Sequence, residues 1–152
     1  VLFRSAMNTL ATLSTSLLLA LPIAAQPATA VAYGASCYGL TLTSTLPVVG
    51  TSMGLTTTGV PVGAVTFTGL GLARTIAPGP FLALPWDPDA CRLHVVAPTP
   101  YLTLPLGAPT VTLWLVVPNN PALLGFLFYA QSFATFSTPW LSSNGIEATV
   151  GL

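Results

Sequence analysis

Fifteen prolines, spread along 152 residues, limit this chain to short elements of secondary structure. A proline inside a helix removes a backbone hydrogen bond and clashes with the preceding turn, so the sequence argues against helices of any length. The segments between the prolines alternate apolar residues with Thr or other polar residues, which is the period-two pattern of a half-buried strand. This alternation is clearest at residues 40–43, 110–117 and 146–150.

Turn-forming residues divide the rest of the chain into further short strands. Strands are also expected at residues 50–58, 64–72, 91–97 and 123–135. Groups of Gly, Pro, Asn, Asp and Ser predict turns at residues 59–61, 77–80, 87–89, 98–100, 119–121 and 143–145. About seven to nine short strands at this spacing predict an all-β fold, a two-layer antiparallel β-sandwich of Ig-like or jelly-roll-like type.

The composition adds a shortage of charge to this pattern. Charged residues make up 4% of the chain and hydrophobic residues 53%, whereas a soluble domain carries about 25% charged residues. Threonine on the outer faces of the strands is expected to replace the missing charge. The formal net charge is zero and no basic patch is present to neutralise phosphates, which excludes nucleic acid as a partner.

The N-terminus is expected to be processing sequence. Residues 1–6 include a run that resembles the translated end of a sequencing adapter, and we interpret them as an artefact. Residues 7–30 resemble a secretory signal peptide, with small residues at Ala28 and Ala30 that suit cleavage after Ala30. Ala25 is a second candidate for the cut, and an uncleaved anchor is the alternative, because the segment before the apolar centre lacks Lys and Arg.

Removal of that segment leaves residues 31–152 as a single β-sandwich domain, secreted or at the cell surface, without a transmembrane helix. Cys37 and Cys91 are its only cysteines. An even number of cysteines in an exported chain predicts a disulfide. Closing the long loop between Cys37 and Cys91 would stabilise the folded protein by about 4 kcal/mol. The alternatives are buried free thiols or a metal site, but Cys37, Cys91 and His94 do not complete a zinc site.

The remaining ionisable residues do not predict catalysis. Besides His94 they are few, namely Arg74, Asp87, Asp89, Arg92 and Glu147. Asp87 and Asp89 lie two residues apart in a predicted turn, where carboxylates commonly bond to nearby backbone amides, and no further carboxylate is close enough in sequence to complete a calcium site. His94 is expected on the solvent side of a strand, with no marked Ser or Asp beside it. We therefore expect no enzyme, no cofactor and no metal.

The three tryptophans are the strongest candidates for ligand contact. Trp86 lies beside a predicted turn and Trp140 follows Pro139, so both are expected in loops where they could stack on a sugar or anchor a partner. Trp114 is expected on the Thr face of its strand. The alternative is that these rings pack in the core or in a subunit interface.

Residues 34–152 resemble a module known from secreted proteins of planctomycete-type bacteria, where it usually forms the C-terminal part of a longer chain. The residues that carry this resemblance are GASC (34–37), PVVG (47–50), ACRL (90–93), VPNNPALLG (117–125), FYAQ (128–131) and SNG (143–145). The resemblance implies a β-sandwich of unknown molecular function with its two cysteines at Cys37 and Cys91. It assigns no catalytic residue.

These observations favour a non-catalytic secreted or cell-surface module that packs against envelope or extracellular proteins. The alternative is a carbohydrate-binding domain that uses Trp86 and Trp140 as platforms for a polysaccharide. An enzyme would need His94 or Asp87 in a cleft with a shifted pKa.

Overall fold

The structure is a computed structural model, and it describes residues 25–74, 91–96, 99–103, 108–135 and 140–152. This part of the chain forms eight strands and one short 3-10 helix. They are β1 (Thr29–Tyr33), β2 (Thr41–Ser44), β3 (Ser52–Thr58), β4 (Val65–Gly71), β5 (Thr99–Thr103), β6 (Thr110–Val116), η1 (Pro121–Leu123), β7 (Leu127–Thr135) and β8 (Leu141–Thr149). The predicted all-β fold with short strands is confirmed.

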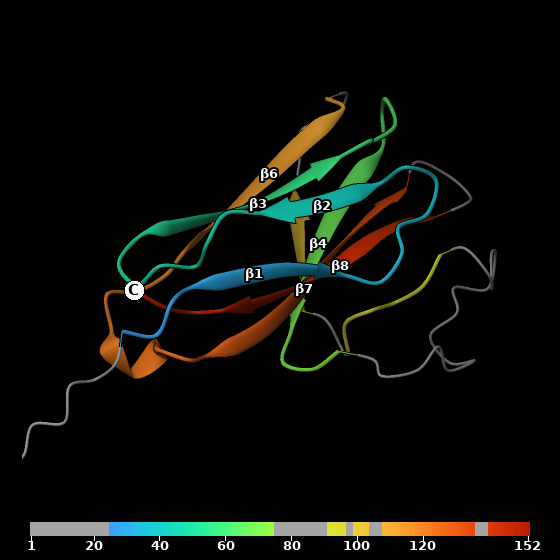
Figure 1. The fold of residues 1–152 in the computed structure, drawn as a ribbon. Helices are drawn as coiled ribbons and strands as arrows, with labels where there is room; N and C mark the ends of the chain where they lie inside the picture. The colour runs from blue at the N-terminus through green and yellow to red at the C-terminus, as the bar shows by residue number, and fades with distance from the viewer. Residues whose placement is uncertain (1–24, 75–90, 97–98, 104–107, 136–139) are drawn as a thin grey trace, which may run out of the picture.

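The strands form two antiparallel sheets that face one another. One sheet has five strands in the order β1-β8-β7-β4-β5, and the other has three in the order β2-β3-β6. Figure 1 shows them as separate layers, with β2 of the three-stranded sheet over β8 of the five-stranded sheet. The two-layer antiparallel β-sandwich is therefore confirmed.

Two apolar clusters lie between the sheets, and a layer of hydroxyl groups separates them. The first cluster includes Ala130, and the second includes Ala134. Ser132 lies between them on the inner face of β7, where its hydroxyl accepts a hydrogen bond from Thr57 at 2.7 Å and contacts the hydroxyl of Thr68 at 2.9 Å. Thr57 belongs to the opposite sheet, so these buried hydroxyls join the two layers.

Asn144 makes a second connection between the sheets. Its Oδ1 accepts a hydrogen bond from the Leu42 N–H at 2.9 Å, and its Nδ2 donates to the Leu42 carbonyl at 3.0 Å. Residues 143–145 were expected to form a turn, which is wrong, because they lie inside β8. The amide of Asn144 pairs with the backbone of β2, and its Nδ2 also donates to the neighbouring Gly145 carbonyl at 3.2 Å.

Three other expectations about local structure are also wrong. Residues 98–100 were expected to be a turn, but Thr99 and Pro100 begin β5, an edge strand in which proline is tolerated. In place of the strand expected at residues 91–97, the described residues 91–96 contain only single bridge residues, Arg92 and Val95, and Val95 pairs with Arg74. Threonine is not confined to the outer faces, because Thr57, Thr66 and Thr68 are buried.

The N-terminal residues of the described chain are part of the sandwich. Thr29 and Ala30 pair with Thr149 and Ala148 at the start of β1. Before the strand, the carbonyl of Gln26 accepts a hydrogen bond from the backbone N–H of Leu152 at 2.9 Å. In the part of the chain that the structure describes, no helix is long and apolar enough to cross a membrane.

Candidate functional site

Of the two tryptophans proposed as platforms, Trp140 lies within the described residues. Trp86 lies outside them, as do Asp87 and Asp89. Trp140 is half-buried at the start of β8, and its ring stacks on Phe67 with centroids 5.9 Å apart and planes inclined by 23°. One face of this ring is therefore covered by another aromatic side chain.

The predicted disulfide is confirmed. Cys37 and Cys91 are bonded, with their Cα atoms 5.1 Å apart, and both side chains are buried. The bond joins the connection between β1 and β2 to the start of residues 91–96. Its role here is structural, since it fixes one end of a segment that carries little secondary structure of its own.

Residues 91–96 lie against the outer face of the five-stranded sheet. Gln131 points outward from β7 and binds the segment at two places: its Oε1 accepts from the His94 N–H and its Nε2 donates to the Arg92 carbonyl, both at 2.7 Å. Tyr33 of β1 donates its hydroxyl to the His94 carbonyl at 2.9 Å. The backbone of the segment also pairs with the sheet at its end, through the bridge between Arg74 and Val95 and through the Val96 N–H, which donates to the Ala73 carbonyl at 2.8 Å.

Most of the ionisable groups in the described residues gather around this segment. Arg74 Nη1 lies 3.4 Å from Glu147 Oε2, and Arg74 Cζ lies 5.6 Å from the centre of the Tyr33 ring. His94 places Nε2 2.9 Å from the carbonyl of Ala35. Burial raises the pKa of Tyr33 to about 12, and the nearby Tyr129 adds to this effect.

This arrangement holds the segment in place and does not present a reactive pair. The carboxylate of Glu147 is paired with Arg74, and Tyr33 remains a neutral hydrogen-bond donor at ordinary pH. Within the described ranges, no three His, Cys, Asp or Glu side chains come together as metal ligands.

The outer face of the three-stranded sheet is rich in threonine, with Ser52, Gly54, Trp114 and Val116 at one end. The strand register places Thr43, Thr56 and Thr112 side by side across β2, β3 and β6. A second row in the same order follows, made of Thr41, Thr58 and Thr110. Neighbouring strands lie about 4.8 Å apart, so the hydroxyls form a compact array. Thr56 and Thr112 bring their hydroxyls within 2.9 Å of one another.

Trp114 lies at the end of this array and is 64% exposed. Its register partner on β3 is Gly54, which has no side chain to lift the ring off the sheet. A Cβ atom at Gly54 would lie only 3.0 Å from the six-membered ring of the indole, so the ring rests on the glycine backbone. Thr45 lies next to this pair, and its hydroxyl accepts a hydrogen bond from the Gly54 N–H at 2.8 Å.

We call this surface the Thr–Trp face. It consists of the outward residues Thr41, Thr43, Thr56, Thr58, Thr110, Thr112 and Trp114, with Gly54 beneath the indole. None of these residues carries a charge. The face therefore offers one aromatic ring and several hydroxyl groups, which can both donate and accept hydrogen bonds. This combination suits a ligand that is itself uncharged and rich in hydroxyl groups.

The sequence indicated only half of this site. The alternation of residues 110–117 places Trp114 on the Thr face of its strand, which the structure confirms. The sequence pattern did not indicate that Gly54 belongs to the site, because its position under the Trp114 ring depends on the register between β3 and β6. Comparisons of the chain with protein-family models, with curated proteins and with solved structures find no match.

Proposed function

We propose that this protein is a non-catalytic extracellular module that binds a neutral polysaccharide on the Thr–Trp face. The observation that carries the proposal is the exposed indole of Trp114 lying over Gly54 beside two rows of threonine. The proposal keeps the carbohydrate-binding function expected from the sequence and moves it from Trp86 and Trp140 to Trp114.

The chemistry of a sugar ring supports this assignment. A pyranose has an apolar C–H face, which packs on an aromatic ring, and hydroxyl groups at its rim, which need hydrogen-bond partners. Tryptophan combines a large apolar surface with a rigid shape, so it anchors ligands with little loss of conformational entropy. Thr43 and Thr110 are exposed on the same face of the sheet and can bond to sugar hydroxyls. The lack of charge disfavours anionic glycans, which would lose hydration without gaining a cation.

The disulfide supports an extracellular location. Disulfides persist in oxidising compartments and are rare in the cytosol. The bond between Cys37 and Cys91 is buried in the described fold. We therefore place the module outside the cell or on its surface, where polysaccharides are available as ligands.

Trp114→Ala is expected to weaken polysaccharide binding by about 30-fold or more, as the loss of a central aromatic anchor does. The test is binding of the purified protein to cellulose, chitin, xylan and β-glucan by depletion from solution, followed by calorimetry on soluble fragments. Gly54→Ala is a second variant, because its methyl group would push against an unchanged Trp114. It should also weaken binding.

Two controls make this experiment decisive. Thr99→Ala lies on the edge strand of the other sheet and should bind like the parent protein. A polyanionic glycan such as heparin should not bind. If no neutral glycan binds the parent, or if Trp114→Ala binds as the parent does, the polysaccharide proposal is wrong. The packing of the module against envelope proteins would then be the better hypothesis.

The secreted protein is expected to begin at Gln26, after cleavage at Ala25. Cleavage after Ala30 would remove Thr29 and Ala30 from β1, together with the carbonyl of Gln26 that accepts from Leu152. Expression of the chain in an export-competent bacterium, followed by intact mass and N-terminal sequencing of the exported protein, measures the cut directly. A stable exported protein that begins at Val31 would contradict this expectation.

A further inference from the structure

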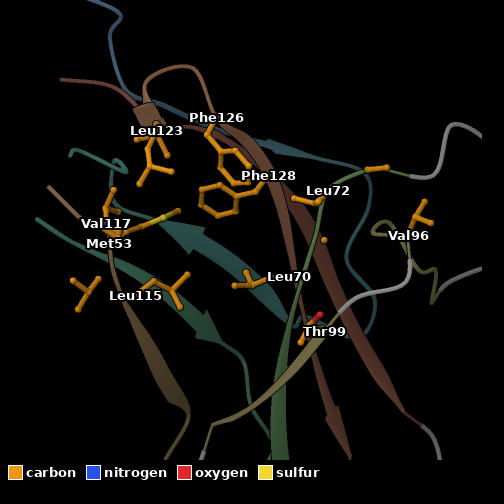
Figure 2. A pocket seen from close by; sticks show the side chains of 15 residues that line it. Met53, Leu70, Leu72, Val96, Thr99, Leu115, Val117, Leu123, Phe126 and Phe128 are labelled. Carbon is orange, nitrogen blue, oxygen red and sulfur yellow. The ribbon is translucent and has the colours of Figure 1, made fainter. Parts of the chain in front are cut away.

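A cavity of about 750 Å³ lies between the two sheets, next to η1. It is bounded by Leu70 from β4, Leu115 from β6 and Phe128 from β7, which approach it from both layers of the sandwich. Figure 2 shows Leu123, Phe126 and Phe128 grouped at one end, with Leu70 and Leu115 farther along. A volume of this size is within the range of small-molecule pockets, about 300–1,000 Å³.

The lining of the cavity is apolar almost throughout. Of its fifteen lining residues, Thr99 alone has a polar side chain, and none has a charged one. Water in such a cavity would lack hydrogen-bond partners. A charged or strongly polar ligand would lose its hydration without compensation. The lining therefore selects a hydrocarbon.

The cavity also opens to solvent through apolar side chains. Leu72 and Val116 at its rim are 73% and 78% exposed, and Phe126 is 45% exposed. Exposed apolar residues gathered around a concave site commonly mark a ligand-binding surface. A ligand can therefore place an apolar chain between the sheets while its other end remains in water.

We propose that this cavity binds the hydrocarbon chain of a lipid, with the polar end of the lipid at the rim. The ligand class follows from the lining: a long acyl chain needs apolar surface and no hydrogen-bond partner along its length. Because no charged side chain lines the cavity, recognition depends on the chain and hardly on the headgroup. Lipids with anionic, cationic or neutral headgroups and the same chain should therefore bind with similar affinity.

The interior of this cavity is distinct from the Thr–Trp face, although both use β6 and the rim residue Val116 lies on the same side of that strand as Trp114. Trp114 and Leu115 are consecutive residues of that strand and point to opposite sides of the sheet, Trp114 outward and Leu115 into the cavity. A substitution at one position can therefore test one site and leave the other intact. Failure of the lipid proposal and failure of the polysaccharide proposal are thus distinguishable.

The experiment is titration of the purified full protein with cis-parinaric acid, a fatty acid whose fluorescence increases in an apolar environment. The parent should bind it saturably with Kd in the micromolar range. Leu115→Trp fills part of the cavity and should weaken binding by about tenfold or more. Trp114→Ala should bind the probe as the parent does. Dodecyl maltoside and dodecyltrimethylammonium should both compete, and the bound probe should raise Tm of the parent.

A second substitution guards against misfolding of the first. Leu72→Asn changes an exposed rim residue, so it should leave the fold intact and still weaken binding of cis-parinaric acid. Equal binding of cis-parinaric acid by the parent, Leu115→Trp and Leu72→Asn would overturn the proposal. The absence of saturable binding to the parent would overturn it as well.

Discussion

Replacing Gln131 by Met is expected to lower the free energy of unfolding by about 3 kcal/mol. The Gln131 side chain is fully buried, and it serves the His94 N–H, the Arg92 carbonyl and the Ser143 carbonyl. Methionine keeps the length of the side chain and removes all three hydrogen bonds. Each buried backbone group left without a partner costs about 1–3 kcal/mol. Water that reaches the half-buried residues 92 and 94 would reduce the total, which is why we expect the lower part of the range.

The effect should be concentrated in residues 91–96. Gln131 and the Tyr33 hydroxyl attach the middle of this segment to the outer face of the five-stranded sheet, whereas the disulfide and the pairing with residues 73 and 74 hold its two ends. In Gln131→Met, hydrogen exchange of the His94 amide should become faster, because this N–H loses its acceptor. The amides of β3 and β6, in the other sheet, should change little beyond the global loss of stability.

Gln131→Glu is the matched control, because it has the same shape as the parent residue. Its carboxylate can still accept from the His94 N–H but faces the carbonyl oxygens of Arg92 and Ser143. Burial and these oxygens raise the pKa of the introduced carboxyl above the unfolded value of about 4.3. The protonated form donates to one carbonyl, so the variant is most stable below that value. It loses stability as pH rises toward the raised folded pKa.

Urea unfolding of the parent and both variants at pH 4 and pH 7 measures these differences. The deficit of Gln131→Glu relative to the parent should be larger at pH 7, whereas that of Gln131→Met should be nearly the same at both values. Equal stability of Gln131→Met and the parent would show that Gln131 does not hold the segment. A deficit of Gln131→Glu that is independent of pH would contradict the assigned hydrogen bonds.

The alternation of apolar residues with Thr was sufficient to find most of the sandwich. It located β3, β4, β6 and β7 within a few residues, although β7 is buried on both faces. It predicted a turn at residues 143–145, because Ser, Asn and Gly are typical turn residues, although these residues lie inside β8. Asn144 is kept there by the backbone of Leu42, which is remote in sequence and belongs to the other sheet. Such long-range partners are invisible to a local pattern.

The buried threonines show a second limit. Thr57 and Thr68 alternate with their neighbours in the same way as Thr43 or Thr112, but they face inward. They tolerate burial because Ser132 supplies a hydroxyl partner. The pattern predicts the period of a strand. Which face is buried depends on the side chains that are available inside the sandwich as packing or hydrogen-bond partners.

Only part of the candidate site could be predicted from the sequence. The exposure of Trp114 on a threonine-rich strand follows from the alternation alone. Its value as a platform follows from Gly54, and that pairing depends on the strand register. The cavity could not be anticipated at all, since its lining comes from segments that are distant in sequence.

Removal of the disulfide is expected to lower the free energy of unfolding by about 4 kcal/mol, from the entropy of the long loop that it closes. The loop runs from Cys37 to Cys91, which are 54 residues apart. We propose the double variant Cys37→Ala/Cys91→Ala, because a single substitution would leave a reactive thiol. Thermal unfolding of the parent and this variant should differ by more than about 10 °C. A reducing agent should lower Tm of the parent only.

The disulfide and Gln131 hold the same segment, so their effects should not be additive. The disulfide fixes residue 91, and Gln131 fixes residues 92 and 94. Without the disulfide the segment can leave the sheet more readily, and Gln131→Met should then cost less than about 3 kcal/mol, which is the coupling that a double-mutant cycle measures. Polysaccharide binding at low temperature should survive in the disulfide variant, because Trp114 lies on the other sheet. Additive losses of stability would show that the disulfide and Gln131 stabilise separate parts of the fold.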